Sequence, residues 1–199
     1  MYRTSLELET KKHGNTPNQG VATRANNLAM CLHRQKNYKE AKPLMTLALE
    51  TEKQLHGEEH LSVALAMDNL ATILSALGQF SEAEPLCRKA LAIFKASGQD
   101  GHAAICAGNL AGCLEDLDRM DEAKAMYQEA LEIKKKVFGN EHPRVSAALH
   151  NLAVILWVQD HGSVEANRLG KQALEISAKS LGPDHPRTRA LRQDWWGEK

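Results

Sequence analysis

Leucines recur in pairs four residues apart, and each pair marks the inward face of a predicted helix. Residues four apart lie on one side of an α-helix, so both members of a pair can pack against the same neighbour. The predicted helices of this kind, called A helices below, carry Leu28/Leu32, Leu70/Leu74, Leu110/Leu114 and Leu152/Leu156. Each is followed by a second predicted helix, called a B helix, that starts near a Glu-Ala pair and runs through Ala-Leu.

Two short sequence markers keep one period along the chain. The tripeptide Asn-Leu-Ala begins at Asn27, Asn69, Asn109 and Asn151, at steps of 42, 40 and 42 residues (69−27, 109−69 and 151−109). The Glu-Ala and Ala-Leu markers of the B helices recur in the same register. Self-similarity at this period predicts a solenoid in which each helix pair buries its apolar face on its neighbours.

Glycine, histidine and proline mark the predicted helix ends. Glycine readily takes the left-handed conformation that often follows a helix, so the B helices are predicted to end at Gly57, Gly98, Gly139 and Gly182. A helices are predicted to restart after His142-Pro143 and His185-Pro186, because proline suits the first helical position. Ser81 and Asp121 precede the glutamates of two B helices, and we expect them to be N-caps.

These signals divide the chain into four repeats, at residues 15–57, 58–98, 99–139 and 140–182, and two terminal segments. Residues 1–14 match the end of a B helix, so they are either part of an upstream repeat in a longer array, which we favour, or an N-terminal cap. Residues 183–199 are expected to form a C-terminal capping helix. Trp195 aligns with Leu152, and its ring is expected to cover the open core of the last repeat.

The third and fourth repeats depart from the common pattern. Gly170 stands in the fourth repeat where Tyr127 stands in the third, so we expect looser packing there. The third repeat lacks the proline and has Gly101-His102. Histidines recur near the junctions between repeats, where a histidine at a helix start can satisfy unpaired backbone N–H groups; they are His60, His102, His142 and His185.

Composition narrows the classes of partner and compartment. Lys+Arg and Asp+Glu number 25 each, so no basic surplus attracts phosphate backbones, and nucleic acid is not an expected partner. The four cysteines have no spacing typical of zinc or of a disulfide framework, and free thiols suit a reducing cytoplasm. The longest apolar run, residues 152–158, is too short to span a bilayer, so no membrane partner is expected.

Candidate chemistry is sparse despite nine histidines. The sequence contains no glycine-rich phosphate loop, nucleophile elbow, HExxH motif or paired-carboxylate constellation. His56 and His60 are four residues apart but flank Gly57, so they do not share a helical face as two zinc ligands would. We therefore expect no enzyme activity, metal or cofactor.

Four motifs carry a family resemblance that covers nearly the whole chain. They are Asn26-Asn27-Leu28-Ala29, Glu82-Ala83-Glu84-Pro85-Leu86, Ala130-Leu131-Glu132-Ile133 and Gly182-Pro183-Asp184-His185-Pro186. The sequence resembles long-period tetratricopeptide repeats of the kinesin-light-chain and nephrocystin-like type. HEAT and armadillo repeats share the period, but the recurring small residues of the B helices favour the tetratricopeptide interpretation. The resemblance implies an all-α fold, a right-handed α-solenoid of antiparallel helix pairs.

In tetratricopeptide arrays the A helices line a concave groove, so the resemblance implies that the recurring asparagines contact an extended peptide or a partner helix. An amide side chain both donates and accepts hydrogen bonds, which suits binding to a peptide backbone. The implied groove residues are Asn26, Asn27, Met30, His33, Arg34, Asp68, Asn69, Thr72, Asn109, Glu115, Asp116, His150, Asn151, Val154 and Trp157. The alternative role of these asparagines is hydrogen bonding between adjacent helices. The resemblance also implies an alternative role for Trp195: grooves of the kinesin-light-chain type accept a tryptophan flanked by acidic residues, so residues 194–198 could be a pseudo-ligand for the chain's own groove or a neighbour's.

The expected function is that of a non-catalytic adaptor or scaffold that binds a protein or peptide. A structural or regulatory repeat arm of a larger protein, or an array that self-associates end to end, is the alternative. Replacing groove asparagines separates the two, because only the adaptor interpretation predicts that a partner is lost while the fold remains.

Overall fold

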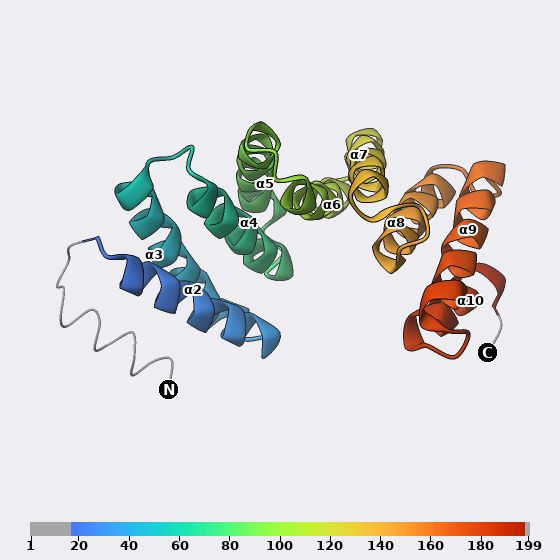
Figure 1. Ribbon diagram of the computed structural model, residues 1–199, viewed down its shortest axis with the longest axis horizontal. Coiled ribbons are helices and arrows are strands. Elements are labelled where there is room, and N and C mark those ends of the chain that lie inside the picture. Colours follow the sequence, from blue (N-terminus) through green and yellow to red (C-terminus); the bar gives the residue numbers. More distant parts are fainter. Residues whose placement is uncertain (1–16, 198–199) are drawn as a thin grey trace. The chain divides into compact units, whose positions relative to one another are not determined.

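The computed structural model describes residues 17–197, which form nine α-helices and no strand (Figure 1). The helices are α2 (Gln19–Arg34), α3 (Tyr38–His56), α4 (Leu61–Ala76), α5 (Phe80–Ala96), α6 (Asp100–Asp116), α7 (Met120–Phe138), α8 (Pro143–Gln159), α9 (Val164–Leu181) and α10 (Pro186–Trp196). The predicted N-terminal segment, residues 1–14, lies outside the described residues. The α-solenoid class is confirmed.

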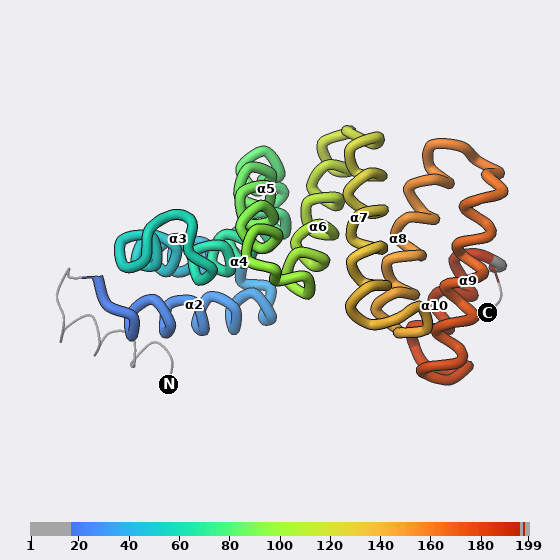
Figure 2. The backbone as a smooth tube through the Cα atoms, turned by 45° about the horizontal axis from the view of Figure 1, so that its top comes forward, coloured from blue at the N-terminus to red at the C-terminus, as the bar shows by residue number. Residues whose placement is uncertain are grey.

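The chain divides into two compact units, Met1–Gln99 and Asp100–Lys199, called the N-terminal unit and the C-terminal unit below. In the N-terminal unit α2 pairs with α3 and α4 pairs with α5, and α3 packs on α4. In the C-terminal unit α6 pairs with α7, α8 pairs with α9, α7 packs on α8, and α10 packs on α9. Figure 2 shows the antiparallel path of these pairs most clearly in α6 to α9.

The core is built from leucines between closely packed alanines. Alanines at the markers are almost fully inaccessible, with Ala29, Ala41 and Ala123 each 0% exposed. The predicted leucines of α2, α4 and α6 are all buried, as is Leu152 of α8. Leu156 is only half-buried, since α10 ends at the position aligned with Ala153, one turn short of it.

Histidines cap three helices, as expected. The Nδ1 atom of His142 accepts a hydrogen bond from the backbone N–H of Arg144, at 3.1 Å. His60 and His185 make the same bond to the residue two positions on. Each histidine satisfies one of the backbone donors that a helix N-terminus leaves unpaired, and Pro143 occupies the first helical position behind its cap.

The prediction that Ser81 and Asp121 are N-caps is wrong. The caps are Gln79 and Arg119, and Ser81 and Asp121 lie inside the first turns of α5 and α7. The cause is the tight turn before each helix. At Gly78 the chain takes a φ of 73°, and the N–H of Gln79 returns to the carbonyl of Leu74 at 2.9 Å. Because this closure ends one helix and starts the next at once, the N-cap of α5 is Gln79, two residues before Ser81.

His102 is also misplaced by the sequence reasoning. It lies within the first turn of α6 and not in a turn before a helix. The step from Asn69 to Asn109 is two residues shorter than the others, and Gly98, with a φ of 65°, turns the chain directly into a helix that starts at Asp100. The B helix before this turn also ends slightly earlier than predicted, with Ser97 as its C-cap.

The expected loose packing at Gly170 is not found. Gly170 is buried, and a Cβ atom on it would lie 2.5 Å from Cδ2 of Trp195. The indole ring of α10 thus occupies the space that Tyr127 fills with its own side chain in the third repeat. A buried hydrogen bond between the hydroxyl groups of Ser177 and Thr188, at 2.8 Å, also joins α10 to α9. This contact is the one that the capping interpretation of Trp195 requires.

The cap at His142 generates a stability prediction. Replacing His142 by Ala removes the acceptor for the N–H of Arg144 and is expected to lower the free energy of unfolding by about 0.5–2 kcal/mol. His142→Asn should restore most of this loss, because asparagine is a favoured N-cap. Urea unfolding followed by circular dichroism measures both. Equal midpoints for the Ala and Asn variants would contradict a capping role.

The contact between Gly170 and Trp195 generates a second prediction. Gly170→Ala should destabilise the protein by about 1–3 kcal/mol, because the added methyl overlaps the indole ring. In a Trp195→Ala background the same change should stabilise by up to about 1 kcal/mol, because alanine is the better helix former. A thermal-unfolding double-mutant cycle measures this reversal of sign. Additive effects would show that the ring does not occupy this space.

Candidate functional site

The sequence-predicted groove residues lie on the A helices of both units, and each unit is described by itself. In the N-terminal unit, Asn26, Asn27, Met30, His33 and Arg34 lie on α2, and Asp68, Asn69 and Thr72 lie on α4. In the C-terminal unit, Asn109, Glu115 and Asp116 lie on α6, and His150, Asn151, Val154 and Trp157 lie on α8.

Two of the asparagines meet in the N-terminal unit. The Nδ2 atom of Asn69 donates to Oδ1 of Asn26 at 3.0 Å, which joins α4 to α2. Asn27, the repeat equivalent of Asn69, is exposed, and its Oδ1 atom accepts from Asn26 at 3.3 Å. The alternative role of the asparagines, bonding between adjacent helices, is therefore present at this pair. It still leaves part of each amide free to bind other groups.

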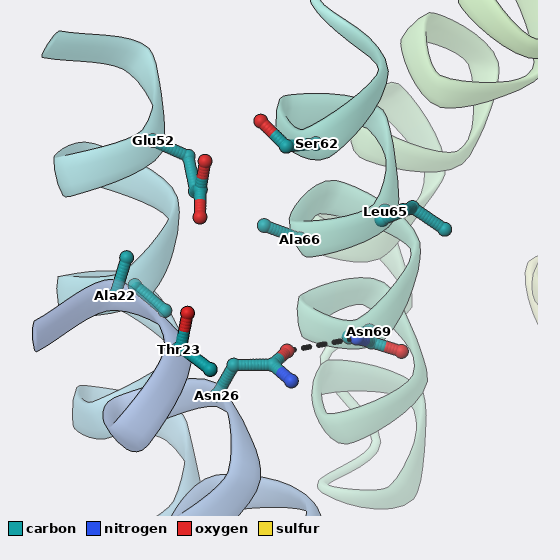
Figure 3. Close-up of a pocket in the computed structure, with 9 residues that line it drawn as sticks. Ala22, Thr23, Asn26, Glu52, Ser62, Leu65, Ala66 and Asn69 are labelled. Carbon is teal, nitrogen blue, oxygen red and sulfur yellow. Dashed lines mark hydrogen bonds between the residues drawn. The ribbon is translucent and has the colours of Figure 1, made fainter. Parts of the chain in front are cut away.

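A cavity of about 230 Å³ lies beside this asparagine pair, between α2, α3 and α4 (Figure 3). Its lining residues are Ala22, Thr23, Asn26, Ala48, Glu52, Ser62, Leu65, Ala66 and Asn69. Glu52 is 8% exposed and extends from α3 toward α4. Its Oε1 atom accepts from Gln19 at 2.7 Å, while Oε2 has no hydrogen-bond partner.

The other predicted residues of the N-terminal unit vary in accessibility. Met30 and His33 are half-buried, and the His33 ring lies 5.3 Å from that of Tyr38. Arg34 is exposed at the end of α2. The Thr72 hydroxyl donates to the carbonyl of Asp68 at 2.9 Å, so only its acceptor capacity remains for a ligand.

In the C-terminal unit, Glu115 is held by the neighbouring helix. The Tyr127 hydroxyl on α7 donates to Oε2 of Glu115 at 3.0 Å. Burial, with the negative charge of Glu115, raises the pKa of Tyr127 well above its usual value, so the phenol remains a donor. Asp116 is exposed and Asn109 is half-buried on the same helix.

Three predicted residues of α8 line a second cavity, of about 220 Å³, with residues of α9 and α10. The lining residues are His150, Val154, Trp157, Asn167, Asp194 and Trp195. Trp157 is 38% exposed, and its ring meets that of Trp195 edge-on at 6.2 Å. Asn151 lies outside this lining and is exposed. The site therefore offers an aromatic wall beside polar groups.

The hydrogen bond from the Trp195 indole and the burial of His150 both favour a neutral imidazole in this cavity. Its Nε1–H donates to Nδ1 of His150 at 3.2 Å, which requires an unprotonated Nδ1. Burial lowers the pKa of His150, and the more distant Asp194, at 3.7 Å from Nε2, opposes that effect only in part. The neutral imidazole is thus the form that fits the native structure.

A third cavity, of about 200 Å³, was missed by the sequence reasoning. It lies between α6, α7, α8 and α10, and its lining residues are Gly101, Ala104, Ile105, Lys134, Phe138, Arg144, Ala147 and Arg187. Three of these are cations from three different helices. The sequence does contain a sign of it: the equivalent B-helix position is Glu52 in the first repeat and Lys134 in the third. The groove prediction considered only residues of the A helices and therefore did not include this position.

Within residues 17–197 no group of three or more His, Cys, Asp or Glu side chains has a geometry that could hold a metal ion. The cysteines at 31, 87, 106 and 113, all within the described range, form no disulfide. No helix in this range is long and apolar enough to cross a membrane. The groups that the structure brings together are amides, carboxylates, cations and aromatic rings, which are the groups of a binding surface.

Comparison with known families gives matches along most of the chain. Two family models described as tetratricopeptide repeat match it, one over residues 20–96 and 103–163 and the other over 145–187. Human tetratricopeptide repeat protein 19, mitochondrial, is 31% identical over 133 residues, which are 61% of this chain and 34% of that protein. The protein KINESIN LIGHT CHAIN-RELATED 1 of Arabidopsis thaliana is 33% identical over 100 residues, 49% of this chain and 16% of its own length.

Solved structures share the fold. A putative kinesin light chain of Podosopora anserina with nearly identical TPR-like repeats superposes with a TM-score of 0.74 at 25% identity, over 86% of this chain and 81% of that one. The apo form of RapI gives a TM-score of 0.80 at 17% identity, over 98% of this chain and 70% of the other. This chain spans about a third of the length of its human relative.

The His150–Trp195 contact generates a pH prediction. Because the pKa of His150 is lowered in the folded state, its contribution to stability is complete above the unfolded value of about 6.5 and is lost as the pH falls through the folded value. His150→Gln keeps an acceptor but does not titrate. As the pH falls from about 7.5 to about 5, the free energy of unfolding measured with urea should decrease more in the native protein than in this variant. Parallel losses would contradict the assignment.

Proposed function

Because the chain belongs to the tetratricopeptide-repeat family and is of the kinesin-light-chain-like type, we propose that it is a non-catalytic adaptor that binds an extended peptide or a helix of a protein partner along its A helices. The proposed contacts in the N-terminal unit are the residues of α2 and α4 around the Asn26–Asn69 pair. Those in the C-terminal unit are Asn109, Glu115 and Asp116 of α6 and the α8 residues beside Trp157.

The asparagine pair with its adjoining cavity is the observation that carries the proposal. Asn26 and Asn69 bond to each other at 3.0 Å, and both line a cavity large enough to admit a side chain. Each amide has two donors and an acceptor with two lone pairs, so one mutual bond leaves groups available to a peptide backbone. Side chains of the peptide would be selected by the cavities beside that backbone.

The aromatic cavity of the C-terminal unit supports the same function. Trp157 and Val154 offer apolar area next to the polar groups of His150 and Asn167. Binding sites for peptides commonly combine an apolar anchor with a few polar groups that fix its orientation. The Trp157 side chain is 38% exposed, so it can pack against a ligand without a change in the fold.

Self-association remains the second interpretation of the array. Val158 and Val164, near the turn between α8 and α9, are 47% and 83% exposed, so apolar surface is available outside the proposed groove. Light scattering distinguishes the two interpretations, since only self-association raises the mass with concentration. An adaptor that remains a monomer and binds peptides would exclude the structural arm.

The proposed compartment is the cytoplasm. Its support is that the four cysteines, of which Cys87, Cys106 and Cys113 are buried, form no disulfide in the described part of the chain. The name of the human relative places that protein in mitochondria, so compartment has to be measured for this chain. Expression with a C-terminal fluorescent tag in cells that carry a mitochondrial marker measures it, and co-localisation with the marker would replace the cytoplasmic assignment.

The adaptor function predicts that Asn151 can be changed without loss of fold. Asn151 is exposed, so Asn151→Ala should leave the urea midpoint unchanged. Its affinity for a groove ligand should fall about fivefold to tenfold, which corresponds to the loss of one hydrogen bond of about 1 kcal/mol. The ligands are peptides enriched by the intact chain from a displayed random peptide library, and fluorescence anisotropy measures their affinity.

Gln128→Ala serves as the matched control, since Gln128 is an exposed amide residue on α7, a B helix of the same unit. It should bind the selected peptides as the native chain does. Unchanged affinity of the Asn151 variant for every selected peptide would remove Asn151 from the site. A library that yields no binding peptide would overturn the adaptor function itself.

A further inference from the structure

Two of the cavities occupy the same place in different repeats. Glu52 and Lys134 each follow the first alanine of their B-helix marker by eleven residues (52−41 and 134−123). Thr23 and Ile105 each precede the A-helix asparagine by four (27−23 and 109−105). One cavity lies between α2, α3 and α4, and the other lies between α6, α7 and α8 with α10. We call them the Glu52 pocket and the Lys134 pocket.

The Glu52 pocket combines a buried carboxylate with hydroxyl groups. Figure 3 shows the Glu52 carboxylate extending into the space between α3 and α4, with Thr23 and Ser62 on either side. Oε2 of Glu52 accepts no hydrogen bond, and the Nε2 atom of His56 lies 3.6 Å from it, beyond hydrogen-bond distance. That same Nε2 atom contacts Oε1 of Gln19 at 2.9 Å. The carboxylate therefore lacks a directly bonded cation.

The Lys134 pocket has the opposite charge. Lys134 from α7, Arg144 from α8 and Arg187 from α10 line one cavity of about 200 Å³. Among the described residues no carboxylate forms an ion pair with any of the three. Burial, together with the charges of Arg187 and Arg144, lowers the pKa of Lys134. Arg144 also lies over the Phe138 ring, at 4.9 Å from its centroid, which holds its guanidinium beside the cavity.

The other two repeats have no charge at this position. The equivalent residue is Phe94 in the second repeat and Ser177 in the fourth (94−83 and 177−166). Phe94 is fully buried in the core, and Ser177 is bonded to Thr188. A charged side chain here is thus not required by the fold. Each charged group that is poorly paired also costs free energy of folding, so its presence needs another reason.

We propose that the two pockets are charge-selective side-chain sites of opposite sign: the Glu52 pocket binds a lysine or arginine side chain of a bound polypeptide, and the Lys134 pocket binds an aspartate or glutamate side chain. This inference rests on the proposed function, because the side chains belong to a peptide held along the A helices. A bound ammonium or guanidinium gives Glu52 a charge-assisted donor, with further acceptors in Thr23 and Ser62. A bound carboxylate relieves the repulsion among three cations.

Apolar walls extend the selectivity beyond charge. The Glu52 pocket is bounded by Ala22, Ala48 and Ala66, which suit the methylene groups of a long basic side chain. The Lys134 pocket exposes Ile105, 45% accessible, next to Phe138. We therefore expect an apolar residue to accompany the acidic one in a peptide bound to the C-terminal unit.

The first test uses small probes, so that it does not depend on a peptide ligand. The full chain, with methyl-labelled alanine, is titrated with butylguanidinium chloride and with sodium butyrate, each against sodium chloride at equal ionic strength. Butylguanidinium should shift the Ala22 and Ala66 methyl resonances saturably, and butyrate should shift those of Ala104 and Ala147. Each probe should leave the other pair of resonances unchanged.

Two neutral variants test the charged groups themselves. Glu52→Gln should weaken butylguanidinium binding about tenfold or more while butyrate binding stays the same. Lys134→Gln should have the reverse effect. The amide oxygen introduced by Glu52→Gln can still accept from Gln19, so the fold should be unaffected. Unchanged methyl resonances of Ala29 and Ala71, which are buried in the N-terminal unit but do not line the pocket, would confirm this.

If a neutral variant changes the shape of its pocket, a charge-reversal variant still tests the proposal, because it places the cations of the Lys134 pocket in the Glu52 pocket. Glu52→Lys with Ser62→Arg reproduces two cations of the Lys134 pocket at the equivalent positions, since Ser62 and Arg144 each precede an asparagine by seven residues (69−62 and 151−144). Butyrate should then shift the Ala22 and Ala66 resonances. Probes that bind neither pocket saturably, or that bind both without regard to charge, would overturn the proposal.

Peptide selection separates this proposal from the adaptor function. Peptides enriched by the native chain should carry a basic position that disappears when Glu52→Gln is the bait, and an acidic position that disappears with Lys134→Gln. Binding peptides whose composition ignores both variants would leave the adaptor function intact and reject the charge selectivity. Saturable, charge-selective probe binding without any selected peptide would leave the charge selectivity of the pockets intact and reject the adaptor function.

Discussion

The close approach of alanine-faced helices is the contact on which the rest of the structure depends. Ala29, Ala41 and Ala123 are fully inaccessible, and a larger side chain at any of them would force neighbouring helices apart. The tight turns complete the constraint. At Gly78 and Asp118 the backbone is left-handed, and the next N–H returns to the preceding helix, so the second helix of each pair starts at a set angle. Each pair presents the same two faces, and stacking follows from that repetition.

In the C-terminal unit α10 packs on α9, and one side chain makes the central contact between them. Gly170 leaves a gap in α9, and Trp195 from α10 fills it while its Nε1–H bonds to His150. The same ring forms one wall of the cavity beside Trp157. A residue that closes the core therefore also shapes a candidate binding site, so changes at Trp195 affect stability and recognition together.

Repeat architecture separates positions that the fold determines from positions that remain free to vary. The alanines of the B-helix markers recur because packing requires them. The position eleven residues beyond the first alanine does not recur: it is Glu52, Phe94, Lys134 and Ser177 in the successive repeats. The backbone there is helical each time, so the repeats differ at this position in side-chain chemistry and not in backbone conformation. A binding array can thus acquire specificity without a change in its helix packing.

The sequence alone determined the period, the helix pairs, most of the inward leucines and three of the four proposed histidine caps, because these follow from local geometry and from spacing along one chain. It also placed the candidate residues on the A helices. Only the tertiary structure decided that Asn69 bonds to Asn26 and not to its equivalent Asn27, that Ser81 lies inside a helix, and that Trp195 fills the gap at Gly170. The sequence shows the change of charge between Glu52 and Lys134, but only the tertiary structure shows that a pocket forms beside each of them. Contacts between residues some tens of positions apart depend on how neighbouring helices rotate and pack, and spacing along a single helix does not specify that rotation.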